Sequence, residues 1–357
     1  MKNDTASRAP LLLEGIQYLR GIAALMVVFH HARNEFGGAM SVTLGARGVE
    51  IFFVISGLVM MYSTRGGVIA GKTTFLERVS ASVLFWKRRF LRVAPLYWIA
   101  LLLSAQFVSQ VGFIDPLLLK DALFIPHWNQ AFTDEIWPTL VPGWSLNYEM
   151  FFYFLFGLSL LFSRYSVKLL CASIFALCAL RLAFESNSAV FLFYTSSVMF
   201  HFIAGVLLYY VIELMRQRPA WIPSRWILCM ALLAGFAGLG ISPAWAGAFW
   251  LLLPTSLIVV AAVFLFDGIR LPVCRLLGDA SYSIYLFHLL VFTFTHQAIT
   301  WSGLAAVSKW EILANFAIYV STATLAGVAI HLAIEKPLTQ YMAGFVRRKA
   351  AAPVAAR

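Results

Sequence analysis

The sequence predicts an all-α protein: a polytopic transmembrane helical bundle of about ten spans, with both termini in the cytoplasm. Of its 357 residues, 61% are hydrophobic and only 12% are charged. That charged fraction is about half the value for an ordinary soluble domain, and a soluble globule cannot cover its surface with so few polar residues. Apolar runs of about 20 residues, the length that crosses a bilayer, recur along the chain.

The composition excludes a soluble enzyme, a disordered chain and a nucleic-acid-binding module. The net charge of +11 fits the loop charge bias of a membrane protein better than a DNA-binding surface. The four cysteines lie in or beside apolar runs without CxxC spacing, and the histidines do not cluster, so we expect no metal site.

The expected spans form one membrane domain, 16–337, between a cytoplasmic tail at 1–15 and a basic cytoplasmic tail at 338–357. The first apolar run ends in polar residues without a cleavage site, so we interpret it as a retained span and not as a signal peptide. The ten spans are expected over 16–36, 47–64, 90–110, 145–163, 167–185, 194–214, 225–242, 246–266, 279–300 and 311–335.

The distribution of basic residues supports this count. With the N-terminus placed in the cytoplasm, 21 of the 27 lysines and arginines fall in cytoplasmic segments and 5 in outer segments, which leaves Arg20 inside the first span. The positive-inside rule predicts a bias of this direction and size.

Two of the expected loops are long. The cytoplasmic loop at 65–89 is basic, and the third span begins inside its arginine cluster. The outer loop at 111–144 is acidic and carries Trp128, Trp137 and Trp144. Tryptophan near a membrane surface is usually an interface anchor. The alternative is a platform on which sugar rings stack.

Two ionisable side chains, Arg20 and His31, lie in the first span. Such residues are costly in a membrane and mark candidate functional sites. Their spacing corresponds to about three helical turns, so both lie on one face, about 16 Å apart along the axis. An arginine there can bind a phosphate or a carbonyl, and a histidine can take a proton from a hydroxyl. A snorkelling arginine with an interfacial histidine is the alternative.

Arg88, Arg89 and Arg92 gather at the expected entrance of the third span, followed by Tyr97. Their i, i+3 and i, i+4 spacing lets them converge on one anion. We therefore predict phosphate binding at this cluster. A cluster that only sets topology or contacts lipid headgroups is the alternative.

Glu149 lies about one turn inside the apolar fourth span. A carboxylate there needs a partner, and His31 is expected at a similar depth. A Glu–His pair would orient the imidazole. The alternative is an acid at a helix start that the helix dipole favours.

In the ninth span, Ser281, Tyr285 and His288 recur at i, i+4 and i+7 and so lie on one helix face. A single histidine on such a face is more often packed in the core than functional. Glu50 marks the outer start of the second span.

Several motifs, in order from about residue 16 to 337, resemble those of the acyltransferase-3 family of integral membrane acyltransferases. Each motif is weak alone, and together they are specific. They are YLRGIAAL at 18–25 with the Arg20/His31 spacing, GVEIFFVISG at 48–57, RRFLRVAPLY at 88–97, WSLNYE at 144–149 and LGDASYSIYLFH at 277–288.

The resemblance implies ten core helices and transfer of an acetyl group from cytoplasmic acetyl-CoA to a sugar hydroxyl of a glycan at or beyond the membrane. Arg20, His31, the arginine cluster and Glu149 match positions that the family uses. Glu50 stands where the family often has aspartate. Some members carry an extra span and a soluble esterase-like domain; we expect this chain to act without them, and it looks most like the stand-alone exopolysaccharide O-acetyltransferases.

These observations give one hypothesis: an O-acetyltransferase of the bacterial inner membrane that uses acetyl-CoA as a substrate and holds no permanent cofactor. Its expected partners are acetyl-CoA, a glycan acceptor and the bilayer, but not nucleic acid, and its oligomeric state stays open. His31, Glu149 and Arg20 are assigned to catalysis. The donor side is assigned Arg88, Arg89, Arg92, Tyr97, Ser281, Tyr285 and His288, and the acceptor side Trp144, Trp128, Trp137 and Glu50.

Two other classes remain open at this point. A transporter or flippase for a glycan or lipid-linked glycan would also have many spans and intramembrane charge, although no two-half repeat is visible. A non-enzymatic scaffold explains the apolar chain but not Arg20, His31 and Glu149 inside it.

Overall fold

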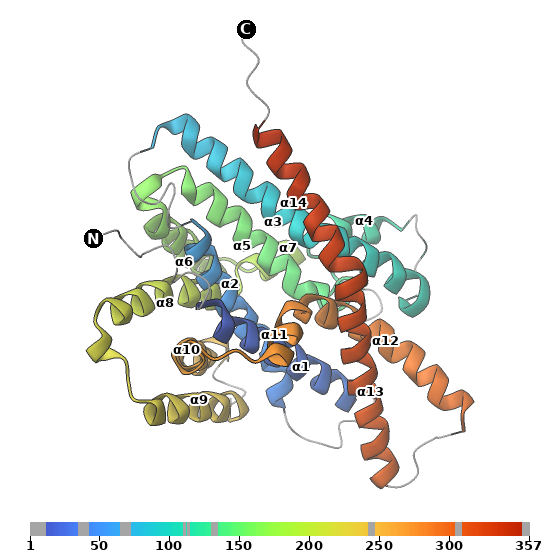
Figure 1. Ribbon diagram of the computed structural model, residues 1–357. Coiled ribbons are helices and arrows are strands. Elements are labelled where there is room, and N and C mark those ends of the chain that lie inside the picture. Colours follow the sequence, from blue (N-terminus) through green and yellow to red (C-terminus); the bar gives the residue numbers. More distant parts are fainter. Residues whose placement is uncertain are drawn as a thin grey trace. The chain divides into compact units, whose positions relative to one another are not determined.

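The computed structural model describes residues 12–34, 43–64, 73–109, 112, 115–129, 135–241, 247–303 and 309–351. Every regular element within these residues is a helix, which confirms the all-α fold class (Figure 1). The chain divides into two compact units, one of residues 1–63 and 197–328 and the other of residues 64–196 and 329–357. Each unit is described by itself.

The first unit contains the helices that carry His31 and His288. They are α1 (Leu12–Asn34), η1 (Thr43–Arg47), α2 (Gly48–Thr64), η5 (Ser197–Met199), α8 (Phe200–Gln217), η6 (Pro219–Trp221), α9 (Arg225–Gly240), α10 (Gly247–Leu265), α11 (Pro272–Asp279), α12 (Ser281–Trp301) and most of α13 (Lys309–Ile330).

The second unit contains the arginine cluster and Glu149. Its elements are α3 (Phe75–Ser104), the π-helical turn η3 (Ala105–Ser109), α4 (Pro116–Ala122), α5 (Gly143–Leu160), η4 (Ser163–Tyr165), α6 (Ser166–Ala183), α7 (Ala189–Tyr194), the π-helical turn η8 (His331–Glu335) and α14 (Lys336–Ala351).

A helix lies at each of the ten expected spans, but fewer helices of the described residues are long and apolar enough to cross a membrane. Five pass on length and composition, and the pair α11 and α12, bent by 67° at its break, makes up to six. The protein is a multi-pass membrane helical protein, and the count of ten spans is not confirmed. The passing helices are Leu44–Thr64, Phe75–Ser109, Ser163–Ala183, Ala189–Gln217 and Trp310–Gly344.

Helix α3 corrects the expected start of the third span. It begins at Phe75, inside the segment expected to be the cytoplasmic loop at 65–89. A capping box starts it: the Glu77 backbone N–H donates to Thr74 Oγ1 at 3.3 Å, and the Thr74 N–H donates to Glu77 Oε2 at 2.7 Å. The arginine cluster therefore lies in the middle of a helix and not at its entrance.

Helix α14 covers most of the segment expected to be a basic C-terminal tail at 338–357. It follows the π-helical turn η8, in which His331 Nδ1 lies 2.8 Å from Glu335 Oε2. Helix α14 runs alongside α3, and both belong to the second unit (Figure 1). The chain therefore brings a late helix against the arginine cluster.

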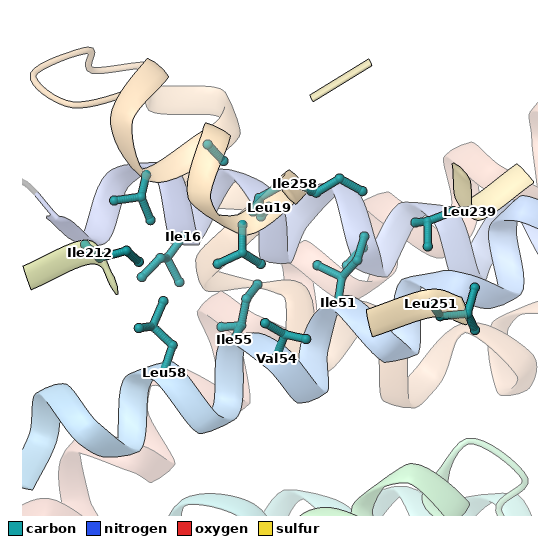
Figure 2. Close-up of a cluster of buried hydrophobic side chains, with 14 residues drawn as sticks. Ile16, Leu19, Ile51, Val54, Ile55, Leu58, Ile212, Leu239, Leu251 and Ile258 are labelled. Atoms are coloured by element: carbon teal, nitrogen blue, oxygen red, sulfur yellow. The ribbon is translucent and has the colours of Figure 1, made fainter. Parts of the chain in front are cut away.

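The core of the first unit is an aliphatic cluster drawn from α1, α2, α8, α9 and α10 (Figure 2). Ile16 and Leu19 of α1 lie in it with Ile55 and Leu58 of α2, and all four are at most 4% exposed. Lipid tails are as apolar as these side chains, so close van der Waals packing between helices stabilises such a core in a bilayer.

The backbones of α1 and α11 approach closely at a glycine. A Cβ atom added at Gly278 would lie 2.1 Å from the carbonyl oxygen of Gln17, so only glycine fits there. Two polar contacts support the same packing. Arg275 Nη1 lies 2.8 Å from Glu14 Oε1, and the Tyr18 hydroxyl donates to the Ile269 carbonyl at 2.8 Å. Together these contacts fix where the chain enters α12.

We predict that Gly278→Ala destabilises the protein, because the added methyl meets backbone that cannot move aside. Overpacking of this kind costs about 1–3 kcal/mol. The measurement is the thermal unfolding midpoint in detergent. Gly240→Ala is the matched control, since a Cβ at Gly240 meets nothing within 4 Å, and its midpoint should stay level or rise. Equal midpoints for the two variants would contradict the close approach.

Candidate functional site

His31 and His288 meet in the first unit. His288 Nε2 lies 3.0 Å from His31 Nδ1, and the two ring centroids are 4.8 Å apart. His31 is on α1, and His288 is on α12 and fully buried. Each histidine also places its Nδ1 on a backbone carbonyl of its own helix, that of Val27 at 3.1 Å and that of Tyr285 at 2.6 Å.

Arg20 and His31 lie on the same continuous helix, so the register expected from their spacing holds. Both side chains are partly buried. Arg20 Nη1 donates to Gln17 Oε1 at 3.2 Å, one turn earlier. This bond orients the guanidinium along α1.

Ser281, Tyr285 and His288 share a buried face of α12, as their spacing predicts. The Ser281 hydroxyl is buried without a hydrogen-bond partner among the described residues. The Tyr285 ring contacts Phe52 of α2 at a centroid distance of 5.9 Å. Assignment of this face to donor binding stays a prediction.

Glu50 lies in the first turn of α2 and pairs with Arg47 of η1, whose Nη1 is 3.3 Å from Glu50 Oε1. The second carboxylate oxygen, Oε2, is buried without a partner in the described part of the chain. A buried acceptor of this kind is unusual and suits a polar ligand. Acceptor binding by Glu50 stays a prediction.

The arginine cluster lines a cavity in the second unit. Its volume is about 370 Å³, and its walls come from the middle of α3 and from one face of α14. Arg88 and Arg92 are exposed, whereas Arg89 is partly buried. The lining residues are Arg88, Arg89, Leu91, Arg92, Thr339, Met342 and Ala343.

Two aromatic rings hold the Arg89 guanidinium. Its Cζ lies 5.6 Å from the centroid of Phe85 and 5.8 Å from that of Tyr153, within the range of cation–π attraction. Arg89 Nε is buried and has no hydrogen-bond partner among the described residues. The Arg89 guanidinium is thus held in place at the cavity, and its Nε–H can still donate a hydrogen bond.

Glu149 is tied to Tyr153, one turn later on α5, whose hydroxyl donates to Glu149 Oε1. The expected pair of Glu149 with His31 joins residues of the two separately described units and stays a prediction. The i, i+4 spacing of Glu149 and Tyr153 was the sequence feature that could have identified this bond.

Tyr97 is buried, donates its hydroxyl to the Asp121 carbonyl at 3.2 Å and stacks on Phe124. It is not among the residues that line the arginine cavity. The role of Tyr97 visible in the second unit is to hold the segment after α4 against α3. Its assignment to donor binding stays a prediction.

The three tryptophans are placed differently from one another. Trp128 is exposed and donates its indole N–H to the Asn187 carbonyl at 3.1 Å. The Trp137 carbonyl accepts from the Asn129 amide at 3.1 Å, and the Trp144 ring meets Tyr148 edge-on at 6.0 Å. A sugar platform and interface anchors both remain open for these residues.

Sequence reasoning missed two parts of these sites. One is the contact between His31 and His288, which lie far apart in the chain without a pattern that links them. The other is the α14 wall of the cavity. Thr339, Met342 and Ala343 follow an i, i+3, i+4 pattern beyond Pro337, which a search for helix periodicity past the proline could have found.

Comparison with known proteins identifies the family of the chain. A family model described as an acyltransferase domain matches residues 13–332. The chain belongs to the acyltransferase-3 family. Arg20, His31, the arginine cluster, Glu149 and His288 all lie within the matched region.

Two relatives match most of the chain. The exopolysaccharide production protein ExoZ of Rhizobium meliloti (strain 1021) is 33% identical over 320 residues, which cover 86% of this chain and 93% of the relative. Acyltransferase MdmB of Streptomyces mycarofaciens is 25% identical over 391 residues, with 96% and 95% covered. No solved structure matches.

The family match identifies an acyltransferase, and the apolar helices of the described residues fit a multi-pass membrane protein. In chemical terms, the described residues offer a histidine pair in one unit and an aromatic-held arginine cluster in the other. A histidine pair can accept and donate a proton, and an arginine cluster can bind an anion.

A histidine–carboxylate pair between α4 and the segment that follows it makes the stability of the protein depend on pH. Buried Asp121 accepts from the Thr139 N–H at 2.9 Å and lies 2.7 Å from His127 Nε2. Its hydrogen bond raises the pKa of His127 above the ordinary value of about 6.5. The stabilisation is therefore complete below the ordinary pKa and is lost as the pH rises through the raised pKa.

We expect the thermal unfolding midpoint of the purified protein to fall between about pH 6 and about pH 8.5, and to fall less in His127→Gln. His296→Gln is the control and should keep the full decrease, because His296 bonds the Tyr319 hydroxyl and not a carboxylate. An undiminished decrease in His127→Gln would refute this account.

Proposed function

We propose that this protein is an O-acetyltransferase of the bacterial inner membrane. It moves an acetyl group from cytoplasmic acetyl-CoA to a sugar hydroxyl of an exported polysaccharide or of its lipid-linked precursor. The observation that carries the proposal is the cavity lined by Arg88, Arg89 and Arg92 in a chain of the acyltransferase-3 family. The printed name of the relative ExoZ supports the choice of acceptor class.

The cavity suits the phosphates of coenzyme A. Arginine binds phosphate through charge-assisted hydrogen bonds, and a guanidinium already held in place loses little entropy when it binds. The aromatic rings of Phe85 and Tyr153 supply that restraint for Arg89. The positive-inside distribution supports a cytoplasmic position for this cluster, on the side where acetyl-CoA is made.

His31 provides the base. As the acceptor oxygen attacks the thioester carbonyl, its proton passes to a ring nitrogen of His31. The C–S bond then breaks, and the proton is returned to the departing thiolate of coenzyme A. In the other route His31 attacks the thioester, the C–S bond breaks and coenzyme A leaves as the thiolate. The acceptor hydroxyl then attacks the acetyl-imidazole, the C–N bond breaks to free His31, and the proton of the hydroxyl goes to the thiolate. Arg20 and Glu149 are the other two side chains that we assign to catalysis.

We predict that Arg88→Ala combined with Arg89→Ala weakens acetyl-CoA binding by at least about tenfold, since a charge-assisted hydrogen bond contributes about 1.5–3 kcal/mol. The Kd is measured with the protein in nanodiscs. Lys87→Ala is the matched control, because Lys87 precedes the cluster on α3 without lining the cavity, and its Kd should stay within about twofold.

The exposed Arg88→Ala alone separates lost binding from lost folding. Absence of acetyl-CoA binding by the folded wild-type protein would overturn the proposed donor and return the transporter hypothesis to first place.

We also predict that His31→Ala and Glu149→Ala each reduce transfer by about 10²–10⁴-fold, the usual contribution of a general base. Acetyl-CoA binding should remain. The assay follows labelled acetyl groups from acetyl-CoA into polysaccharide of the source organism, first treated with mild alkali to free its hydroxyls. Near-normal turnover by His31→Ala would overturn its role. His296→Ala serves as the control.

A further inference from the structure

We propose that His288 is a positioning residue that fixes the tautomer of His31, so that His31 presents an unprotonated Nε2 to the reaction. This inference rests on the proposed function, in which His31 is the base. Its evidence is the set of hydrogen bonds around the two rings, which the sequence alone did not suggest.

The protonation of His288 follows from its backbone contact. Its Nδ1 lies 2.6 Å from the Tyr285 carbonyl oxygen, and a carbonyl oxygen can only accept a hydrogen bond. Nδ1 therefore carries a proton and donates it. In the neutral ring, Nε2 of His288 must then be the unprotonated nitrogen and an acceptor.

The ring of His288 stays neutral because it is fully buried. A buried charge without a partner is strongly unfavourable, and no carboxylate bonds either ring among the described residues. The neighbour of His288 Nε2 is a second imidazole and not an acid.

His31 meets two acceptors at the same nitrogen. Its Nδ1 lies 3.1 Å from the Val27 carbonyl oxygen and 3.0 Å from Nε2 of His288. Both can be satisfied only if Nδ1 of His31 carries the proton and shares it between them. In a neutral ring this leaves Nε2 of His31 unprotonated, and that atom has no hydrogen-bond partner in the described part of the chain.

The result is a base that is oriented by an imidazole, since no carboxylate bonds either ring within the residues that the structure describes. The second nitrogen of a histidine sets which one is available for chemistry, and here a neutral imidazole fulfils that role. The arrangement serves both routes of transfer, because proton abstraction and acetyl-histidine formation each require a lone pair on Nε2. When His31 becomes charged, its Nδ1–H can bond more strongly to His288.

The test compares three variants in the polysaccharide acetylation assay. His288→Leu removes the acceptor and should lower kcat by about 10–100-fold, the range for hydrogen-bond partners that orient metal-bound imidazoles, with KM for acetyl-CoA unchanged. His288→Gln keeps an acceptor oxygen near the position of Nε2 and should recover most of the lost kcat. A structural role alone would not produce this recovery.

His201→Leu is the matched control. His201 is equally buried, and its Nδ1 also lies on the carbonyl three residues earlier, that of Val198 at 3.2 Å, but its Nε2 has no partner among the described residues. We expect the kcat of His201→Leu to stay within about twofold of the wild type. The volume of leucine is close to that of histidine, and volume-conserving replacements are tolerated best.

The outcomes separate the two proposals. If His31→Ala is inactive while His288→Leu keeps near-normal kcat, or if His288→Gln does no better than His288→Leu, the positioning role is overturned and the proposed function stands. If the wild-type protein transfers no acetyl groups, the proposed function fails. If His31→Ala keeps its activity, the role of His31 as the base is overturned, and the positioning role of His288 with it. Where His288→Leu does not fold, nitrogen NMR of labelled histidine in nanodiscs decides, because a protonated Nε2 on wild-type His31 would overturn the inference.

Discussion

The close approach of Gly278 to the backbone of Gln17 determines how α11 and α12 lie against α1 in the first unit. Because α11 lies directly on α1 there, the bend of 67° into α12 carries the second helix back along α1. His288, two turns into α12, then reaches His31. A side chain at residue 278 would separate the helices, and the two imidazoles with them.

A second constraint explains why the polar groups are paired as they are. A membrane core offers no water, so buried polar atoms need partners within the protein. Tyr285 and Val27 satisfy histidines through carbonyl oxygens, and Tyr153 satisfies Glu149. Arg89 instead relies on aromatic faces, which leaves its Nε without a partner among the described residues.

The sequence was sufficient for what depends on local pattern. Hydrophobic runs located a helix at every expected span, and spacing placed Ser281, Tyr285 and His288 on one buried face. It was not sufficient for contacts between distant segments, such as His31 with His288. The start of α3 was missed because hydropathy dominated the interpretation, although Thr74 and Glu77 already formed a recognisable cap. The count of ten spans is not confirmed, since several helices of the described residues are shorter or bent and fall outside a criterion of length and composition.

The wall that α14 gives to the arginine cavity has a consequence for biogenesis. Thr339 and Met342 are synthesised long after Arg89, so the cavity cannot close until almost every other helix has left the ribosome and entered the bilayer. Until then the three arginines on α3 lack the wall that α14 supplies. Assembly of the protein and completion of the arginine-lined cavity are thus coupled in time, and a nascent chain stalled before α14 would carry the charges without the cavity.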